Sequence, residues 1–180
     1  MAGRALKRGA ALLAAGLVFA FGLEFTQLLR TLPALAAANE QVTRVVIEKH
    51  ARRMTLERDG QVLVRYTVAL GSNPIGQKEK EGDGRTPEGV YNVEFKHPRS
   101  RYHLALRVSY PDARAREAAS RAGASPGSDI MIHGIRNGFG WLGALHRERD
   151  WTDGCIAVTN AEIREIWSRV PDGTPVEIRP

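Results

Sequence analysis

The chain has 180 residues, of which 43% are hydrophobic and 26% are charged, and its net charge is +6. This length and composition allow one domain of ordinary size with a buried core, and they do not fit a chain that is disordered throughout. Half of the net charge lies in residues 1–38. We expect no nucleic-acid partner, because the sequence contains no zinc-finger spacing and no clustered basic stripe.

Residues 1–38 have the pattern of a targeting segment. Three positive charges precede an uncharged apolar run of 14 residues, Ala10–Leu23, which is short for a membrane span but fits the apolar region of a signal peptide. Small residues at Ala34–Ala38 offer cleavage sites. An uncleaved anchor that extends to Leu29 fits the same pattern, and only that form would contact the inner membrane. Both alternatives predict that residues 39–180 form a domain outside the cytoplasm, in the periplasm.

The first half of this domain is expected to be built from strands. The pattern over Val42–Val68 is strand-like, and Asp59-Gly60 lies between two alternating runs, which is the strongest short-range signal for a hairpin. Gly71–Gly89 contains five glycines and two prolines, which predicts a long polar loop. Two further strands are expected at Val90–Phe95 and Leu104–Val108.

The second half adds helices. Apolar residues with helical spacing at Ile163, Ile166, Trp167 and Val170 predict a helix that packs on the core, with Asn160 as its N-cap. The other expected elements are a polar helix Asp112–Arg121 capped by Asp112, a strand Ile130–Ile132 ending at His133, an irregular loop Gly134–Gly154, an apolar segment Cys155–Val158 and a closing strand Thr174–Ile178. This content predicts a mainly β domain, a sandwich or a barrel, with one or two short helices.

Cys155 is the only cysteine of the chain. It cannot form an internal disulfide, so it is either an inert core residue or a residue kept for its chemistry. Gly154 allows a sharp turn before the thiol. The backbone N–H groups of Asp153, Gly154 and Cys155 would then be placed to form an oxyanion hole for acyl transfer. Composition alone leaves both interpretations open.

His133 is the histidine best placed to activate a thiol, because it follows an apolar strand and precedes a glycine. A free thiol has a pKa of about 8.5 and needs a base at neutral pH, for which an imidazole is the usual group. The rivals are His50, His97, His103 and His146. We expect His50 and His97 to be solvated in turns, and His146 to help shape a cleft.

Three ordered motifs carry a resemblance to a known family. Ile132-His133-Gly134 precedes Thr152-Asp153-Gly154-Cys155-Ile156, and Gly82–Gly89 lies upstream with a Thr-Pro-x-Gly pattern. Together they resemble the signature of the L,D-transpeptidase catalytic domain family (YkuD-type). The resemblance extends from Val42 to Ile178.

The resemblance implies a role for each matching residue. Cys155 corresponds to the nucleophile and His133 to the general base. Asp153 and Gly154 occupy the positions whose backbone lines the oxyanion hole, and Thr152 corresponds to the small hydroxyl residue, in the substrate site. The implied reaction is acyl transfer on peptidoglycan stem peptides through a thioester, with no cofactor and no metal.

The sequence departs from the family pattern at two positions. Many members have a histidine before the Gly-Cys pair and an arginine two residues after the cysteine, where this chain has Asp153 and Ala157. We therefore expect Arg136, Arg147 or Arg149 to bind the substrate carboxylate, because arginine binds carboxylates bidentately. The alternative is that these arginines form a solvated charged face.

Two other functions remain open for the same residues. Water could capture the thioester, which would make the protein a hydrolase, either an L,D-carboxypeptidase or an amidase that releases a wall-anchored lipoprotein. A transpeptidase would instead form cross-links or exchange the terminal D-amino acid. The domain could also be a non-catalytic wall-binding module, in which Cys155 is buried and unreactive.

Overall fold

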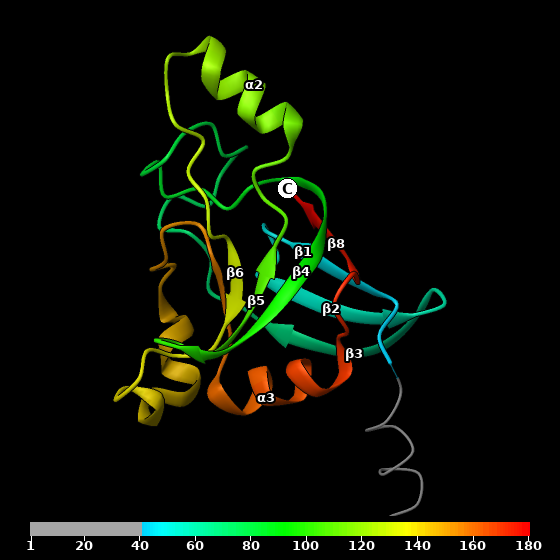
Figure 1. Cartoon of the computed structure of the whole chain (residues 1–180). Coiled ribbons are helices and arrows are strands. Elements are labelled where there is room, and N and C mark those ends of the chain that lie inside the picture. Colours follow the sequence, from blue (N-terminus) through cyan, green and yellow to red (C-terminus); the bar gives the residue numbers. More distant parts are fainter. Residues whose placement is uncertain (1–40) are drawn as a thin grey trace, which may run out of the picture. The chain divides into compact units, whose positions relative to one another are not determined.

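A computed structural model describes residues 41–180, so the targeting segment predicted for residues 1–38 lies outside the described part of the chain. Figure 1 shows a strongly curved sheet with two α-helices and a 3-10 segment around it. The elements are β1 Arg44–Glu48, β2 Arg53–Arg58, β3 Gln61–Thr67, β4 Gly89–Ser100, β5 His103–Val108, α2 Ala113–Arg121, β6 Met131–His133, η1 Gly140–Glu148, β7 Ile156–Ala157, α3 Asn160–Arg169 and β8 Pro175–Arg179.

The predicted hairpin joins β2 to β3. The two strands pair antiparallel, with Arg58 opposite Gln61. Asp59 and Gly60 form the two-residue connection, with φ of 51° and 81°. Positive φ at both positions is what a type I′ turn requires, and its twist matches that of the strands it joins. The hairpin prediction is therefore confirmed.

The eight strands form one sheet in the order β3-β2-β1-β8-β4-β5-β6-β7. β4 connects its two halves, because Gly89–Asn92 pairs with β8 and Val93–Ser100 pairs with β5. The pairing of β4 with β5 shifts register twice, after Val93 and after His97. Such irregularities bend a strand and increase its twist. β4 therefore turns the sheet back on itself, and it is twice as long as the strand predicted at Val90–Phe95.

The two edges of the sheet approach each other through the segment that follows β3. Ala69 and Ala157 exchange two backbone hydrogen bonds, of 2.9 and 2.8 Å, and Gly71 forms a bridge with Thr152. The chain after β3 thus pairs with β7 at the opposite end of the strand order. This pairing makes the sheet barrel-like and confirms the mainly β fold class.

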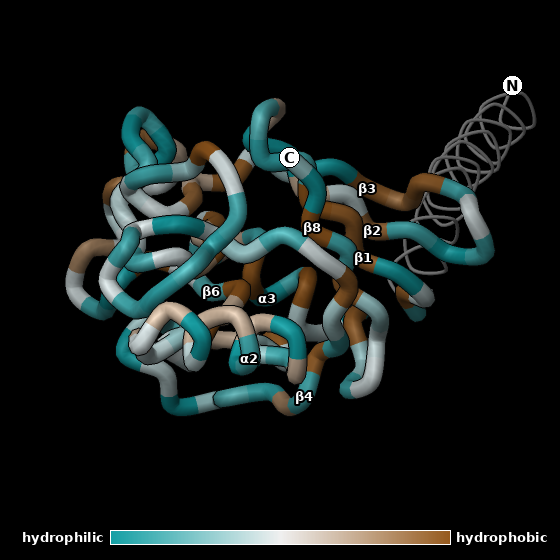
Figure 2. The backbone as a smooth tube through the Cα atoms, turned by 90° about the horizontal axis from the view of Figure 1, so that it is seen from above, coloured by the Kyte–Doolittle hydropathy of each residue, from teal (hydrophilic) through white to brown (hydrophobic). Residues whose placement is uncertain are grey.

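α3 covers the core as predicted, with Ile163, Ile166 and Val170 fully buried. Figure 2 shows hydrophobic segments along β1 and β2 in the interior and hydrophilic loops around them. The predicted cap of α3 is wrong by one residue. Thr159 is the N-cap and forms a capping box with Glu162, which accepts the Thr159 backbone N–H at 2.8 Å. Within residues 41–180, no helix has the length and apolarity needed to cross a membrane.

The loop predicted at Gly134–Gly154 contains an element that the sequence analysis missed, the 3-10 segment η1. Gly143 interrupts η1 with φ of 50° and ψ of −129°, so no regular 3.6-residue periodicity runs through it. The polar helix is confirmed as α2, and the Asp112 side chain accepts the N–H of Ala115. Only Ala119 of α2 is buried, and Figure 1 shows the helix extending away from the sheet.

Three glycines let separate parts of the chain cross beside β7. A Cβ atom on Gly71 would lie 2.1 Å from the carbonyl oxygen of Gly84 and 3.0 Å from the Cα of Gly154. The Gly71 N–H donates to Thr86 Oγ1 at 3.0 Å, and Thr86 is fully buried. The Gly71–Gly89 loop therefore packs directly under the turn that precedes Cys155.

We predict that Gly71→Ala destabilises the protein by about 3 kcal/mol, because the new methyl group collides with rigid backbone. Gly82→Ala is the matched control in the same loop. Nothing lies within 4 Å of its Cβ position, and only its φ of 75° opposes the change, at about 1 kcal/mol. Urea denaturation of both variants gives the comparison. Equal losses in the two variants would contradict the close crossing.

Candidate active site

The Gly154 turn presents Cys155 at the start of β7. Gly154 has a φ of 122° and is buried. A Cβ atom there would lie 2.6 Å from the carbonyl oxygen of Arg85, so only glycine fits. β7 then runs parallel to β6, with Ile156 opposite Ile132. Cys155 directly precedes β7 and His133 ends β6, so the two predicted catalytic residues lie on neighbouring segments of backbone.

The His133 ring is held in one tautomer. Its Nδ1 lies 2.7 Å from the carbonyl oxygen of Gly134. A carbonyl oxygen can only accept, so Nδ1 carries the proton and donates it. Nε2 is then left with its lone pair, which is the form that a general base needs.

Aromatic rings surround this imidazole. The ring centroid of Tyr102 lies 4.5 Å from that of His133, and the centroid of Trp151 lies 5.8 Å away in an edge-on arrangement. His133 is only 3% exposed. Burial lowers the pKa of His133 to about 4, against the hydrogen bond to Gly134, and the nearby His146 lowers it further. The imidazole is therefore neutral at pH 7.

The Cys155 thiol is also neutral in the free protein. Burial raises its pKa to about 11, the charges of Asp153 and Asp129 raise it as well, and the backbone N–H of Met131 opposes them. The Sγ atom donates a hydrogen bond of 3.4 Å to the carbonyl oxygen of Asp129. Both groups that line the cleft are therefore in their neutral forms near pH 7.

Cys155 and His133 line one cleft of about 480 Å³. Its remaining wall is mostly polar and includes residues from β4, the β4–β5 turn and the segment before β6. The charged and hydroxyl-bearing residues of this wall are Arg99, Ser100, Arg101, Tyr102, Ser128, Asp129, Thr152 and Asp153. The cleft is therefore suited to a polar substrate that lies across the thiol.

One of the three backbone N–H groups predicted to form an oxyanion hole already has a hydrogen-bond acceptor within the turn. The Gly154 N–H donates to Thr152 Oγ1 at 3.2 Å, and the same hydroxyl donates to the carbonyl oxygen of Cys155 at 2.7 Å. Thr152 is buried, so its hydroxyl shapes the turn from inside. Among the hydrogen bonds of residues 41–180, none uses the N–H of Asp153 or of Cys155. These two groups are the donors available to an oxyanion.

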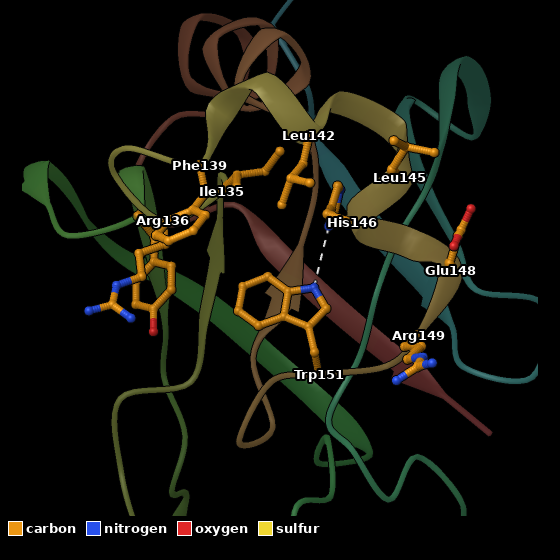
Figure 3. Close-up of a pocket in the computed structure, with 10 residues that line it drawn as sticks. Ile135, Arg136, Phe139, Leu142, Leu145, His146, Glu148, Arg149 and Trp151 are labelled. Carbon is orange, nitrogen blue, oxygen red and sulfur yellow. Dashed lines mark hydrogen bonds between the residues drawn. The ribbon is translucent and has the colours of Figure 1, made fainter.

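The three arginines expected to bind a carboxylate do not line the Cys155 cleft. Arg147 bonds to Glu162 at 3.1 Å and to the carbonyl oxygen of Thr67 at 2.9 Å. Arg136 and Arg149 line a neighbouring pocket of about 590 Å³, drawn in Figure 3. The two cavities share only Tyr102 and Trp151.

Sequence reasoning missed several residues of the cleft. Arg99 and Arg101 belong to the end of β4 and the turn after it, a polar stretch without a strand signal of its own. His97 was expected in a solvated turn, and this was wrong, since it lies within β4 and lines the cleft. His50 is exposed in a turn, as expected. Within residues 41–180, no group of three or more histidine, cysteine or carboxylate side chains could hold a metal ion.

The Gly82–Gly89 motif packs against the turn that carries Cys155 and is held by its own hydrogen bonds. Asp83 accepts the backbone N–H groups of Glu79, Lys80 and Arg85, and it pairs with Lys78 at 2.8 Å. These hydrogen bonds hold the pKa of Asp83 at about 2 against the effect of burial. The loop is thus a rigid base for the glycine crossing.

The sequence matches the family model of the L,D-transpeptidase catalytic domain (YkuD) over residues 42–178. YafK of Escherichia coli K12, a protein named as an L,D-transpeptidase, is 32% identical over 112 residues. These residues make up 61% of this chain and 38% of YafK, so the matched region is well under half of that relative.

Solved structures share the fold. The helical cell shape determining protein Pgp2 of Campylobacter jejuni superposes with a TM-score of 0.58 at 23% identity, over 78% of this chain and 48% of its own. Bd1075 of Bdellovibrio bacteriovorus gives 0.54 at 24% identity, over 77% and 48% of the two chains. An L,D-transpeptidase of Enterococcus faecium gives 0.50 at 18% identity, over 77% and 50%. At these identities the likeness shows the fold alone.

We predict that the stability of the protein falls as the pH is lowered from about 6.5 to 4. The unfolded chain protonates His133 near its usual pKa of 6.5, whereas the folded protein does so only near 4. Protonation therefore favours the unfolded chain in this window, by about 3 kcal/mol when complete. Urea denaturation at several pH values measures the loss. In His133→Gln, unfolding should take up about one proton fewer in this pH range, so the unfolding free energy should depend less steeply on pH. An unchanged dependence on pH would contradict a buried neutral His133.

We also predict that the alkylation rate of Cys155 by iodoacetamide keeps rising with pH up to about 11, because only the thiolate reacts. A short cysteine peptide should level off near its pKa of about 8.5. Intact-mass spectrometry of the modified protein gives the rates. A plateau below pH 8 would show a preformed thiolate and contradict the neutral pair.

Proposed function

The chain belongs to the L,D-transpeptidase catalytic domain family, and we propose that it is a cysteine-dependent acyltransferase acting on peptidoglycan stem peptides. The observation that carries this proposal is the pairing of β6 with β7. It places Cys155 and a His133 with a free Nε2 in the wall of one cleft. A nucleophile, a base and backbone donors are the groups that acyl transfer needs.

In the first step, Cys155 Sγ attacks the carbonyl carbon of the third stem residue, a diamino acid. The thiol proton passes to His133 Nε2 as the C–S bond forms. The N–H groups of Asp153 and Cys155 stabilise the oxyanion. The amide C–N bond then breaks, and the terminal D-alanine leaves as an amine that takes the proton from Nε2. A thioester on Cys155 remains.

In the second step, an amine of another stem or of a free D-amino acid attacks the thioester carbonyl. The new C–N bond forms, the C–S bond breaks, and the amine proton passes through Nε2 to the sulfur. Burial of His133 favours this return, because the imidazolium is costly in surroundings that lower its pKa to about 4. The ring is therefore a carrier of the proton between sulfur and amine.

The polar wall of the cleft supports a role in binding the stem peptide. Arg99 and Arg101 are exposed and line the same cleft as Cys155, so they are suited to the carboxylates of the stem. Arg147 forms an ion pair with Glu162, so its guanidinium is the least available of Arg136, Arg147 and Arg149 for a substrate carboxylate. We keep Arg136 and Arg149, which line the neighbouring pocket, as proposed binding residues for a substrate carboxylate.

The proposed site of action is the periplasm, where the cell wall lies. The basic and apolar pattern of residues 1–38 supports export. The proposed partner is peptidoglycan. A wall-anchored lipoprotein becomes a second partner if water, rather than an amine, captures the thioester.

We predict that Cys155→Ala abolishes release of D-alanine from a purified tetrapeptide stem, while the fold is kept because the change is small. His133→Asn should lower the rate by about 10²- to 10⁴-fold, which is the usual contribution of a general base. Mass spectrometry of the products gives the rates. His50→Asn is the matched control, because His50 is exposed and lies outside the cleft.

The same assay separates the remaining alternatives. No release of D-alanine by the folded native protein would support the wall-binding module, and full activity in Cys155→Ala would contradict Cys155 as the nucleophile. An active native protein that yields only the tripeptide in the presence of an acceptor amine would identify a hydrolase. Formation of an amide with the acceptor would identify a transpeptidase.

A further inference from the structure

The thiol of Cys155 is held by the segment that leads into β6. Asp129 lies two residues before Met131, the first residue of β6, and lines the Cys155 cleft. Its carbonyl oxygen accepts the hydrogen bond from Cys155 Sγ at 3.4 Å. No hydrogen bond within residues 41–180 joins the sulfur to His133. In the free protein the thiol proton is therefore directed at Asp129 and not at the base.

The direction of this carbonyl depends on an unusual backbone conformation. Asp129 has a φ of 58°, in the left-handed region that side-chain-bearing residues rarely adopt and that aspartate tolerates better than most. In the described part of the chain, only Arg52, Asp59 and His103 share a positive φ without being glycine. Because the conformation is unfavourable by itself, contacts around Asp129 must hold it.

The side chain of Asp129 supplies such contacts. Its Oδ1 atom pairs with Arg107 Nη1 at 3.3 Å, and its Oδ2 atom accepts the hydroxyl of Ser128 at 3.2 Å. Arg107 is itself paired with Glu94 at 3.0 Å and lies over the Phe95 ring, 5.7 Å from its centroid. An exposed ion pair stabilises by about as much as a left-handed aspartate costs, so these contacts are sufficient to hold the conformation.

The backbone after Asp129 is fixed to β5. The Val108 N–H donates to the carbonyl oxygen of Ile130 at 2.9 Å, and Met131 lies opposite Arg107 in the sheet. The Met131 N–H is near enough to the sulfur to favour its ionised form. The sulfur therefore lies between a carbonyl that accepts its proton and an N–H that faces it, and both belong to one rigid stretch of chain.

We propose that Asp129 is a positioning residue for the nucleophile: its left-handed backbone, held by Arg107, aims a carbonyl at Cys155 and fixes the sulfur in place for attack. This proposal rests on the proposed acyl transfer. Asp129 takes up no proton and forms no covalent bond. As the sulfur attacks the substrate carbonyl, the S–H bond turns from the Asp129 carbonyl to His133 Nε2, which takes the proton.

The variant Asp129→Val tests the backbone conformation, because a β-branched residue strongly disfavours a positive φ. Cys155 is the only cysteine, so the infrared S–H stretching band of the full chain reports this thiol alone. A hydrogen bond from the thiol lowers the stretching frequency, so the band should move to higher frequency in the variant. The kcat for release of D-alanine from a tetrapeptide stem should fall at least about tenfold, and KM should change less, since a reacting atom misplaced by about 1 Å can cost about a hundredfold in rate.

Two further variants separate conformation from charge and from general strain. Asp129→Asn should keep the native band and most of kcat, because asparagine also adopts a positive φ and its side-chain oxygen can accept from Arg107 and Ser128. Asp59→Val is the matched control, since Asp59 has a φ of 51° in the β2–β3 turn and does not line the cleft. It introduces the same strain and should leave the band and kcat unchanged.

Arg107→Gln gives a second route to the same test if Asp129→Val does not fold. It removes the partner of the carboxylate and leaves Asp129 intact, so the band should shift in the same direction by a smaller amount. A band at the native frequency in every folded variant would overturn the positioning role and leave the proposed acyl transfer standing. A shifted band with native kcat, or an equal effect of Asn and Val at position 129, would also overturn it. A native protein that releases no D-alanine would overturn the acyl transfer, and the band would still decide whether Asp129 holds the thiol.

Discussion

The geometry of the active site depends on how closely three pieces of backbone cross. Gly71, Gly84 and Gly154 bring the strand extension, the long polar loop and the nucleophile turn together, and no side chain fits between them. The same extension pairs through Ala69 with β7 and thereby draws the two edges of the sheet together. This crossing therefore fixes the place where Cys155 emerges, and it joins the edges of a sheet that the irregularities of β4 already bend. The 71–89 loop therefore supports the Cys155 cleft, although none of its residues lines the cleft.

Burial determines the protonation states on which the proposed chemistry depends. The thiol pKa rises to about 11 and the imidazole pKa falls to about 4, so both changes favour the neutral form. A thiolate–imidazolium pair in the free protein would have to overcome both of these pKa shifts. The bond from His133 Nδ1 to Gly134 settles the tautomer, and the rings of Tyr102 and Trp151 limit how the imidazole can turn. The protein thus orients a neutral imidazole, and in the proposed mechanism the thiol proton moves to it only as the substrate is attacked.

Features encoded by neighbouring residues were predictable from the sequence. The Asp59-Gly60 turn and the Asp112 cap each depend on a few adjacent side chains. Features that depend on distant contacts were not. Asn160 has the chemistry of an N-cap, but its side chain accepts the N–H of Ile135 while Thr159 caps the helix. The engagement of the Gly154 N–H by Thr152 likewise follows from the shape of a turn that the distant glycine loop imposes.

In the proposed periplasmic location, which is oxidising, the high pKa of the Cys155 thiol would slow oxidation of the sulfur. Peroxide and disulfides attack the thiolate, and at pH 7 a thiol with a pKa of about 11 is ionised in roughly one molecule in ten thousand, against a few per cent for an ordinary cysteine. The chain has no second cysteine that could reduce a sulfenic acid by forming an internal disulfide. A sulfur that stays protonated at neutral pH is therefore less exposed to irreversible oxidation.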